Sequence, residues 1–207
     1  CFKNYNQKGR YVIFTERDPY YNLTYVELLF KSIDKLFVKG LEFPQDIEAA
    51  PGLLLYVTLI ENYPGEINNL ISYFLDRVIE GLDKTKNAMI RKALIQVVAL
   101  CMWYDVNSTL QYLNEKAAIE DIFKLWITLL PKFKYDYECK RIMIGLSTIF
   151  RANMNELPAV VRTSLPGLIK QLVSFSSKIL FLRIAEEDRG EDYDDDYLSV
   201  RFNEIFF

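Results

Sequence analysis

The sequence contains no histidine among its 207 residues. Histidine is the commonest general base and the commonest metal ligand in proteins, so its absence removes the usual centre of acid–base and metal chemistry. The glycines form no loop of the kind that cradles phosphate groups, and no nucleophile elbow is present. Catalysis would have to depend on lysine, tyrosine or carboxylates alone. We therefore predict that the protein is not an enzyme and uses no cofactor or metal.

Cysteine is also scarce, and Cys1, Cys101 and Cys139 have neither disulfide-framework nor metal-ligand spacing. This usage is typical of a reducing compartment. No apolar run reaches the length of about 20 residues that a membrane span requires, because charged residues interrupt every candidate. Since the sequence begins with Cys1 and shows no signal-like leader, we expect a piece of a longer chain that is not secreted.

Only 8 glycines and 7 prolines interrupt the sequence, and its apolar residues follow helical spacing, so we predict a mostly helical protein. The clearest helix follows Pro64-Gly65 and has an apolar face made of Ile67, Leu70, Ile71, Phe74, Leu75, Val78, Ile79 and Leu82. Its opposite face consists of Asn69, Tyr73, Asp76 and Glu80. One face is predicted to pack on neighbouring helices, and the other to meet solvent or a partner.

Further amphipathic stretches flank this helix on both sides. Asp18-Pro19 is a typical helix start and Gly40 a typical stop, which predicts a helix between them. Pro166 is likewise predicted to open the last helix, which runs to about Ala185. The other predicted helices cover approximately residues 45–63, 88–103, 105–116, 119–133 and 135–153.

These helices follow one another in pairs. Pairs that start near Asp46, Lys86 and Asp136 recur at intervals of about 40 to 50 residues, as HEAT-type repeats do. A hairpin with a broad apolar face buries that face by stacking on its neighbours. We therefore predict an all-α HEAT-repeat solenoid of stacked antiparallel helical hairpins, followed by an acidic loop, with surface recognition as its function.

Four segments are expected along the chain. Residues 1–18 are an irregular lead-in or the remnant of an earlier repeat, residues 19–185 the solenoid, residues 186–196 the acidic loop, and residues 197–207 an aromatic tail. The tail aromatics Phe202, Phe206 and Phe207 are too apolar for water, so we expect them to dock on the last hairpin or elsewhere.

Three stretches resemble the C-terminal repeats of the importin-β (karyopherin) superfamily, specifically of the importin seven and importin eight type. They are "NLISYFLDRVIEGLDKTKNAMIRKALIQVVALCMWYDVNSTLQYL", "IFKLWITLLPKFKYDYECKRIMIGLSTIF", and "LPGLIKQLVSFSSKIL" followed by "EEDRGEDYDDD". The resemblance covers approximately residues 20–196. It implies a receptor that binds protein cargo, contacts nuclear pore proteins, and releases cargo on binding Ran GTPase in its GTP state.

The acidic run concentrates the negative charge of the chain. Residues 186–196 hold eight acids and one arginine, which leaves the rest of the chain net positive although the whole has a formal charge of −3. The eight acids are Glu186, Glu187, Asp188, Glu191, Asp192, Asp194, Asp195 and Asp196. Clustered carboxylates attract basic cargo or Ran, and the alternatives are a solvated disordered loop or a segment that folds back onto the protein's own positive repeats.

Other candidate contacts have ordinary alternatives. Asn69, Tyr73, Asp76 and Glu80 either line the concave surface or form a solvent face without a partner. Trp126 is predicted to be core, and Trp103 is either core or an anchor for a partner. Two basic clusters either form a ridge for an acidic partner or are solvated charges, and they contain Lys84, Lys86, Arg91 and Lys92, and Lys132, Lys134, Lys140 and Arg141.

The resemblance therefore implies the C-terminal part of a nuclear transport receptor found in cytoplasm and nucleus. Its expected partners are basic cargo of the histone or ribosomal type, nuclear pore proteins, and Ran GTPase through the full-length parent. Direct nucleic-acid binding is not expected, because the basic residues are mixed with acids and no nucleic-acid motif accompanies them, and no membrane partner is expected. The alternative is a HEAT-repeat scaffold that assembles an enzyme complex without a transport role.

Overall fold

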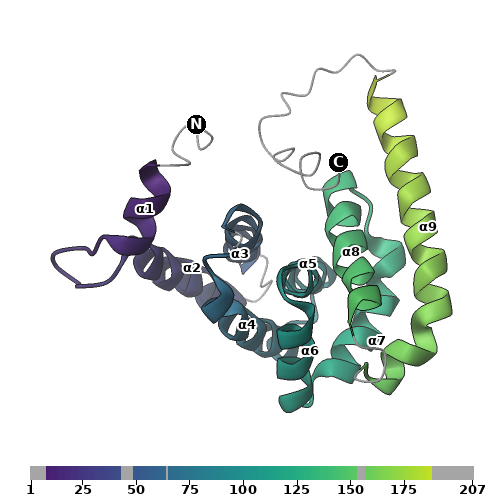
Figure 1. Cartoon of the computed structure of the whole chain (residues 1–207), viewed down its shortest axis with the longest axis horizontal. Helices are drawn as coiled ribbons and strands as arrows, with labels where there is room; N and C mark the ends of the chain where they lie inside the picture. Colours follow the sequence, from purple (N-terminus) through teal and green to yellow (C-terminus); the bar gives the residue numbers. More distant parts are fainter. Residues whose placement is uncertain (1–7, 43–48, 64, 153–156, 188–207) are drawn as a thin grey trace.

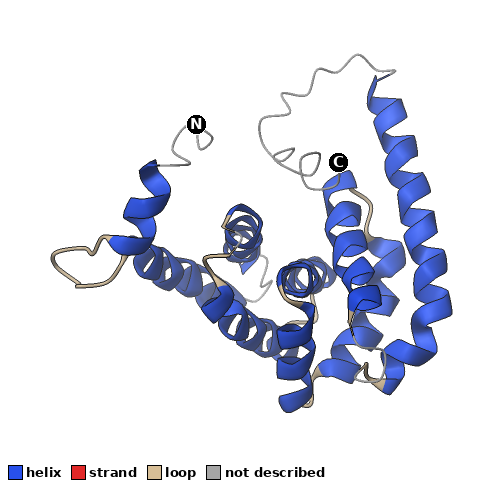
Figure 2. Cartoon of the chain, viewed as in Figure 1, coloured by secondary structure: helices blue, strands red, loops and turns tan. Residues whose placement is uncertain are grey.

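The structure, a computed structural model, describes residues 8–42, 49–63, 65–152 and 157–187. The secondary structure of these residues is helical, without β-strands (Figure 2). One isolated β-bridge joins Arg17 to Thr24. The all-α prediction is thereby confirmed. The α-helices are α1 (Lys8–Thr15), α2 (Tyr25–Glu42), α3 (Ala50–Asn62), α4 (Ile71–Lys84), α5 (Ala88–Tyr104), α6 (Val106–Glu115), α7 (Ile119–Leu129), α8 (Asp136–Thr148) and α9 (Ala159–Glu187). Short 3₁₀ helices are η3 (Asn68–Leu70), η4 (Leu130–Lys132) and η5 (Ile149–Arg151).

The helices form two layers. Helices α3, α5 and α8 pack side by side with α5 in the middle. Figure 1 shows α2, α4, α6, α7 and α9 as an arc around this row. Helix α2 packs on α3, α4 on α5, and α9 on α8, so each helix contacts mainly its neighbours. This arrangement is that of a helical-repeat solenoid, as the sequence predicted.

Helix α5 is the centre of the core, because it packs on α3, α4 and α8 at once. Every side chain from Leu94 to Met102 is buried, including that of Gln96. Asn87 begins the helix and its side chain accepts a hydrogen bond from the backbone N–H of Met89. The sequence of α5 is apolar almost all round, and this predicted its central position correctly.

Helices α5 and α8 approach unusually closely at Gly145. A Cβ atom added to Gly145 would lie 2.6 Å from the Cα and carbonyl oxygen of Ala99. No Cβ atom fits at that distance, so the close contact between the two inner helices requires glycine here.

The start of α2 differs from the prediction. Asp18 does not begin the helix, because its carboxylate instead accepts hydrogen bonds from the N–H groups of Tyr20 and Tyr21 in a turn. The helix begins at Tyr25, where Thr24 and Glu27 exchange hydrogen bonds in a capping box. Gly40 does not end it either, since the helix continues to Glu42. Upstream, residues 8–15 of the segment expected to be irregular form α1.

Pro166 lies inside α9 and does not open a new helix, contrary to the prediction. It is exposed, and the buried residues on both sides of it, Val161 and Leu168, hold the flanking turns against the solenoid. A proline costs the helix one backbone hydrogen bond. Packing of the flanking turns offsets that cost, so the helix continues through the proline.

The predicted pairing of α3 with α4 is also wrong. Helix α3 packs on α2, and α4 packs on α5. Only residues 85–87 connect α4 to α5, and so short a connection places consecutive helices side by side. Helix α4 is therefore the first helix of its pair and lies in the outer arc (Figure 1).

Candidate partner-binding surfaces

The polar face predicted on α4 is occupied largely by contacts within the protein. Asn69 lies in η3 and is exposed, whereas Tyr73, Asp76 and Glu80 lie on α4 and are half-buried. Asp76 forms an ion pair of 3.2 Å with Lys116, the residue directly after α6. This face therefore contributes to packing between α4 and α6, in addition to any contact with a partner.

Tyr73 and Glu80 belong to a polar cluster between α2, α3 and α4. Tyr56 donates a hydrogen bond of 2.8 Å to the carboxylate of Asp34, and Arg77 lies 3.7 Å from the same carboxylate and pairs with Glu80. Burial, with Asp34 as the second cause, raises the pKa of Tyr73 to about 12 and that of Tyr56 still further. Both phenols are protonated at neutral pH, and the cluster holds the three helices together.

The sequence did not predict a second network, which joins α3, α5 and α8. Arg141 of α8 donates hydrogen bonds of 2.6 and 3.0 Å to the two carboxylate oxygens of Glu61 in α3, and a third of 3.1 Å to Gln96 of α5. The side chain of Arg141 is 5% exposed. Arg141 therefore belongs to the core and not to the basic ridge predicted as one alternative. One feature of the sequence could have indicated this network: Glu61 is the one charged residue in the sequence of α3.

The two basic clusters meet through Lys92. Its ammonium group lies 2.7 Å from Glu138 of α8 and 3.4 Å from the carbonyl oxygen of Lys132. Lys132 and Lys134 remain exposed. The structure thus brings together the turn that precedes α8 and the first turns of α5.

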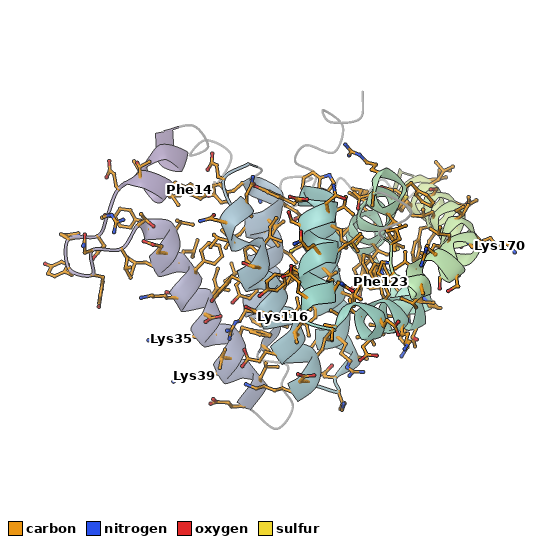
Figure 3. All side chains as sticks on the ribbon, turned by 60° about the horizontal axis from the view of Figure 1, so that its bottom comes forward. Phe14, Lys35, Lys39, Lys116, Phe123 and Lys170 are labelled. Carbon is orange, nitrogen blue, oxygen red and sulfur yellow. The ribbon has the colours of Figure 1, made fainter. Side chains whose placement is uncertain are left out.

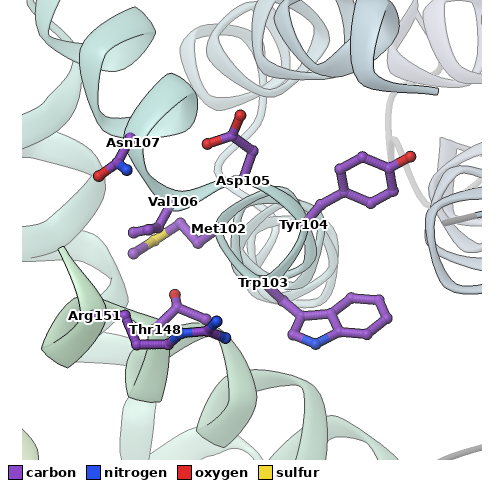
Figure 4. A pocket seen from close by; sticks show the side chains of 8 residues that line it. All are labelled: Met102, Trp103, Tyr104, Asp105, Val106, Asn107, Thr148 and Arg151. Atoms are coloured by element: carbon purple, nitrogen blue, oxygen red, sulfur yellow. The ribbon is translucent and has the colours of Figure 1, made fainter. Parts of the chain in front are cut away.

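A small cavity lies where α5 passes into α6 (Figure 4). It has a volume of about 250 Å³ and is lined by Met102, Trp103, Tyr104, Asp105, Val106, Asn107, Thr148 and Arg151. Asp105 caps α6, and its carboxylate accepts hydrogen bonds from the hydroxyl and backbone N–H of Ser108. These bonds lower the pKa of Asp105, so it is ionised at neutral pH. The cavity is thus lined by aromatic, amide and charged groups.

The two tryptophans differ in position. Trp126 is fully buried and stacks on Phe123 at 5.6 Å, which confirms that it is core. Trp103 is half-buried at the cavity. It also packs against the hydrophobic core, so its role as an aromatic anchor stays a prediction.

Helix α9 has an exposed apolar face at one end of the solenoid. Its members are Ile169, Val173, Leu180, Phe181 and Ile184, each at least 48% exposed. The opposite face packs on α7 and α8 through buried residues such as Phe175. An apolar stripe of this kind is typical of a surface that contacts further protein.

The acidic run falls at the edge of the described chain. Glu186 and Glu187 are the last residues of α9 and so are helical. The other six acids, Asp188, Glu191, Asp192, Asp194, Asp195 and Asp196, lie outside the described residues, as do Phe202, Phe206 and Phe207 of the tail. Their roles stay predictions.

The described residues provide neither a metal-binding cluster nor a membrane-spanning helix. No group of three or more histidine, cysteine or acidic side chains lies close enough there to hold a metal ion. No described helix combines the length and the apolar character needed to cross a bilayer.

Two curated proteins are similar to this chain. One is a "Probable importin-7 homolog" from Dictyostelium discoideum, 25% identical over 175 residues that cover 82% of this chain and 16% of that protein. The other is an "Importin beta-like SAD2 homolog" from Arabidopsis thaliana, 25% identical over 186 residues that cover 85% of this chain and 18% of that protein. The chain thus spans less than a fifth of the length of these relatives. No family model and no solved structure matches it.

Proposed function

We propose that this chain, whose two matches support its assignment to the importin-β superfamily, is the C-terminal part of a nuclear transport receptor that binds protein cargo. The observation that carries the proposal is the 25% identity to two importins across more than four fifths of the chain. The solenoid supports it, because stacked repeats present extended surfaces for recognition.

Recognition in this function combines charge and shape. The acidic residues 186–196 attract lysine-rich and arginine-rich cargo, such as a histone or a ribosomal protein. Trp103 and its cavity offer an aromatic anchor beside Arg151. Ran GTPase and nuclear pore proteins act through the full-length receptor, which moves between cytoplasm and nucleus.

The test of cargo binding is a titration of the chain with a fluorescently labelled histone at 50 and 150 mM salt. We expect binding that weakens about tenfold or more between the two salt concentrations, because exposed charge pairs are screened. A variant in which the acids at 188–196 become the corresponding amides should bind more weakly still. If the variant binds the histone as tightly as the natural chain does, the acidic run does not attract cargo. The α9 face and the cavity then remain as the candidate surfaces.

The test of transport uses Ran. A complex of the complete receptor with its basic cargo should dissociate when Ran bound to a non-hydrolysable GTP analogue is added, and should persist with Ran bound to GDP. Retention of cargo in both cases would contradict the transport function and favour a scaffold that assembles other proteins without transport.

A further inference from the structure

An exposed group of lysines and tyrosines lies at the start of α8. We call it the Tyr135 surface, and it consists of the exposed residues Lys132, Lys134, Tyr135 and Tyr137. The rings of Tyr135 and Tyr137 are nearly parallel, with an interplanar angle of 2° and centroids 5.6 Å apart. Tyr135 is 60% exposed and Tyr137 38%. The two adjacent rings and the exposed lysines together offer a ligand both apolar area and positive charge.

Buried contacts beneath this surface fix its shape. The ammonium group of Lys92 lies 5.5 Å from the ring centroid of Phe133 and 6.0 Å from that of Tyr135, while pairing with Glu138. Glu138 also accepts a hydrogen bond of 3.1 Å from the backbone N–H of Lys134. The turn that presents the lysines is therefore held in place before any ligand arrives, and this reduces the entropy cost of binding.

The acids nearby do not cancel the positive charge. Glu138 pairs with Lys92, and Asp136 pairs with Lys140 one turn along α8. The exposed charges that remain at the turn are those of Lys132 and Lys134. A ligand with closely spaced carboxylates complements this surface.

The same chain contains a segment with closely spaced carboxylates, residues 186–196, and the helix that leads to it lies near this surface. Lys178 of α9 donates a hydrogen bond to the carbonyl oxygen of Phe133, so α9 passes beside the Tyr135 surface. Helix α9 ends at Glu187, nine residues beyond Lys178 and therefore about 14 Å further along its axis. The next nine residues, 188–196, contain six acids and span up to roughly 30 Å when extended. The acidic segment is long enough to return to Lys132 and Lys134.

We propose that the Tyr135 surface binds the chain's own acidic segment, residues 186–196, through pairs between its carboxylates and Lys132 and Lys134. The short connection gives the segment a high effective concentration at the surface, so weak individual pairs suffice to hold it. Basic cargo and acidic partners must then compete with this internal contact, cargo for the carboxylates and acidic partners for the lysines. The proposal does not depend on the transport function, because it concerns the isolated chain.

The direct test is zero-length crosslinking of the full chain with a carbodiimide, followed by peptide mass spectrometry. This reagent joins an amine to a carboxylate that is already in contact with it. We expect crosslinks from Lys132 and Lys134 to the acids of residues 186–196. Their yield should not depend on protein concentration and should fall at 1 M salt, where charge attraction is screened.

Lys35 and Lys39 of α2 serve as the matched control, since they are exposed lysines at the opposite end of the solenoid from Lys170 of α9 (Figure 3). The double variant Lys132→Gln with Lys134→Gln should lose most crosslinks to the acidic segment, whereas Lys35→Gln with Lys39→Gln should keep them. Crosslinks distributed evenly over all exposed lysines, or a yield that rises with concentration, would overturn the proposal.

A second measurement uses a synthetic peptide of residues 186–196 added to the chain. A full chain whose own acids at 188–196 are changed to amides should bind the peptide at least about tenfold more tightly than the natural chain, whose surface is already occupied. Tyr135→Ala in the amide background should weaken that binding. If the natural and the amide chains bind the peptide equally, the surface is free for partners. If neither chain binds it, the surface is not a site for acidic ligands. Either result refutes the internal contact.

Discussion

The ion pair between Glu61 and Arg141 should be the most sensitive polar contact in the solenoid. Its side chains are 15% and 5% exposed, and they connect helices 80 residues apart in sequence. Replacing Glu61 by Leu removes the carboxylate while keeping similar bulk in a helix that has no other charged residue. The guanidinium of Arg141 is then left buried with Gln96 as its remaining partner in this network.

The expected loss follows from this burial. Arginine stays charged in proteins, so the variant must either keep an unpaired charge in the core or open the helix packing to admit water. Removing one partner of a buried pair costs about 3–5 kcal/mol, a large share of the roughly 5–15 kcal/mol that stabilises a typical domain. In urea unfolding followed by circular dichroism, with a slope of about 2 kcal/mol per molar, the midpoint should fall by roughly 1.5–2.5 M.

Two further variants test the reasoning. Glu120→Ala breaks an exposed pair with Lys124, whose side chains are 56% and 60% exposed, and should cost less than about 1 kcal/mol. The double variant Glu61→Leu with Arg141→Met buries no charge and should be about 2 kcal/mol more stable than Glu61→Leu alone. If Glu61→Leu lowers the midpoint no more than Glu120→Ala does, the pair is not buried as the structure has it and the reasoning fails.

Three other outcomes are expected. Gly145→Ala should cost about 2–3 kcal/mol in the same unfolding assay, because its Cβ would lie 2.6 Å from the backbone of Ala99. Asp105→Ala should cost about 1 kcal/mol at pH 7 through loss of the α6 cap. Hydrogen bonds from Ser108 lower the pKa of Asp105 in the folded chain. The stability that this cap contributes is therefore present above pH 4 and is lost as the pH falls further. Burial raises the pKa of Cys101, which should therefore resist a thiol reagent until urea unfolds the chain.

Two of these outcomes have a matched control variant, and the third has a result that would contradict it. Gly167→Ala adds a methyl group where nothing lies within 4 Å, and it should leave stability unchanged or raise it slightly. Asp105→Asn keeps an acceptor for the cap but does not titrate, so its stability should vary less between pH 3 and 5 than that of the natural chain. Labelling of Cys101 in native buffer at the rate seen in urea would show that α5 is not enclosed on all sides.

Much of the fold could be predicted from the sequence because helices α4 to α8 carry their signals locally. The apolar spacing along Ile71, Phe74, Leu75 and Val78 gives one face of α4, and these side chains are buried as expected. The nearly uniform apolar sequence of α5 likewise indicated that it has neighbours on several sides. Such patterns depend on residues three or four positions apart, and the chain fixes these within a single helix.

The candidate surfaces depended on contacts between distant residues. Lys92, Glu138 and Tyr135 come together across α5 and α8, and no local pattern indicated their proximity. For the same reason the sequence placed Arg141 among exposed basic residues, although it is paired in the core. Which charge stays on the surface depends on which helices become neighbours.

The sequence by itself determined that this protein is helical, lacks histidine chemistry and carries eight of its 28 acids in one short run, because these properties follow from composition and local spacing. The tertiary structure alone decided that α3 packs on α2 and α5, that α9 continues through Pro166, and that Glu61 meets Arg141. Each of these depends on packing energy gathered from several helices at once. That energy outweighs the local preference of a proline or a single charge, and it exists only when the repeats are stacked.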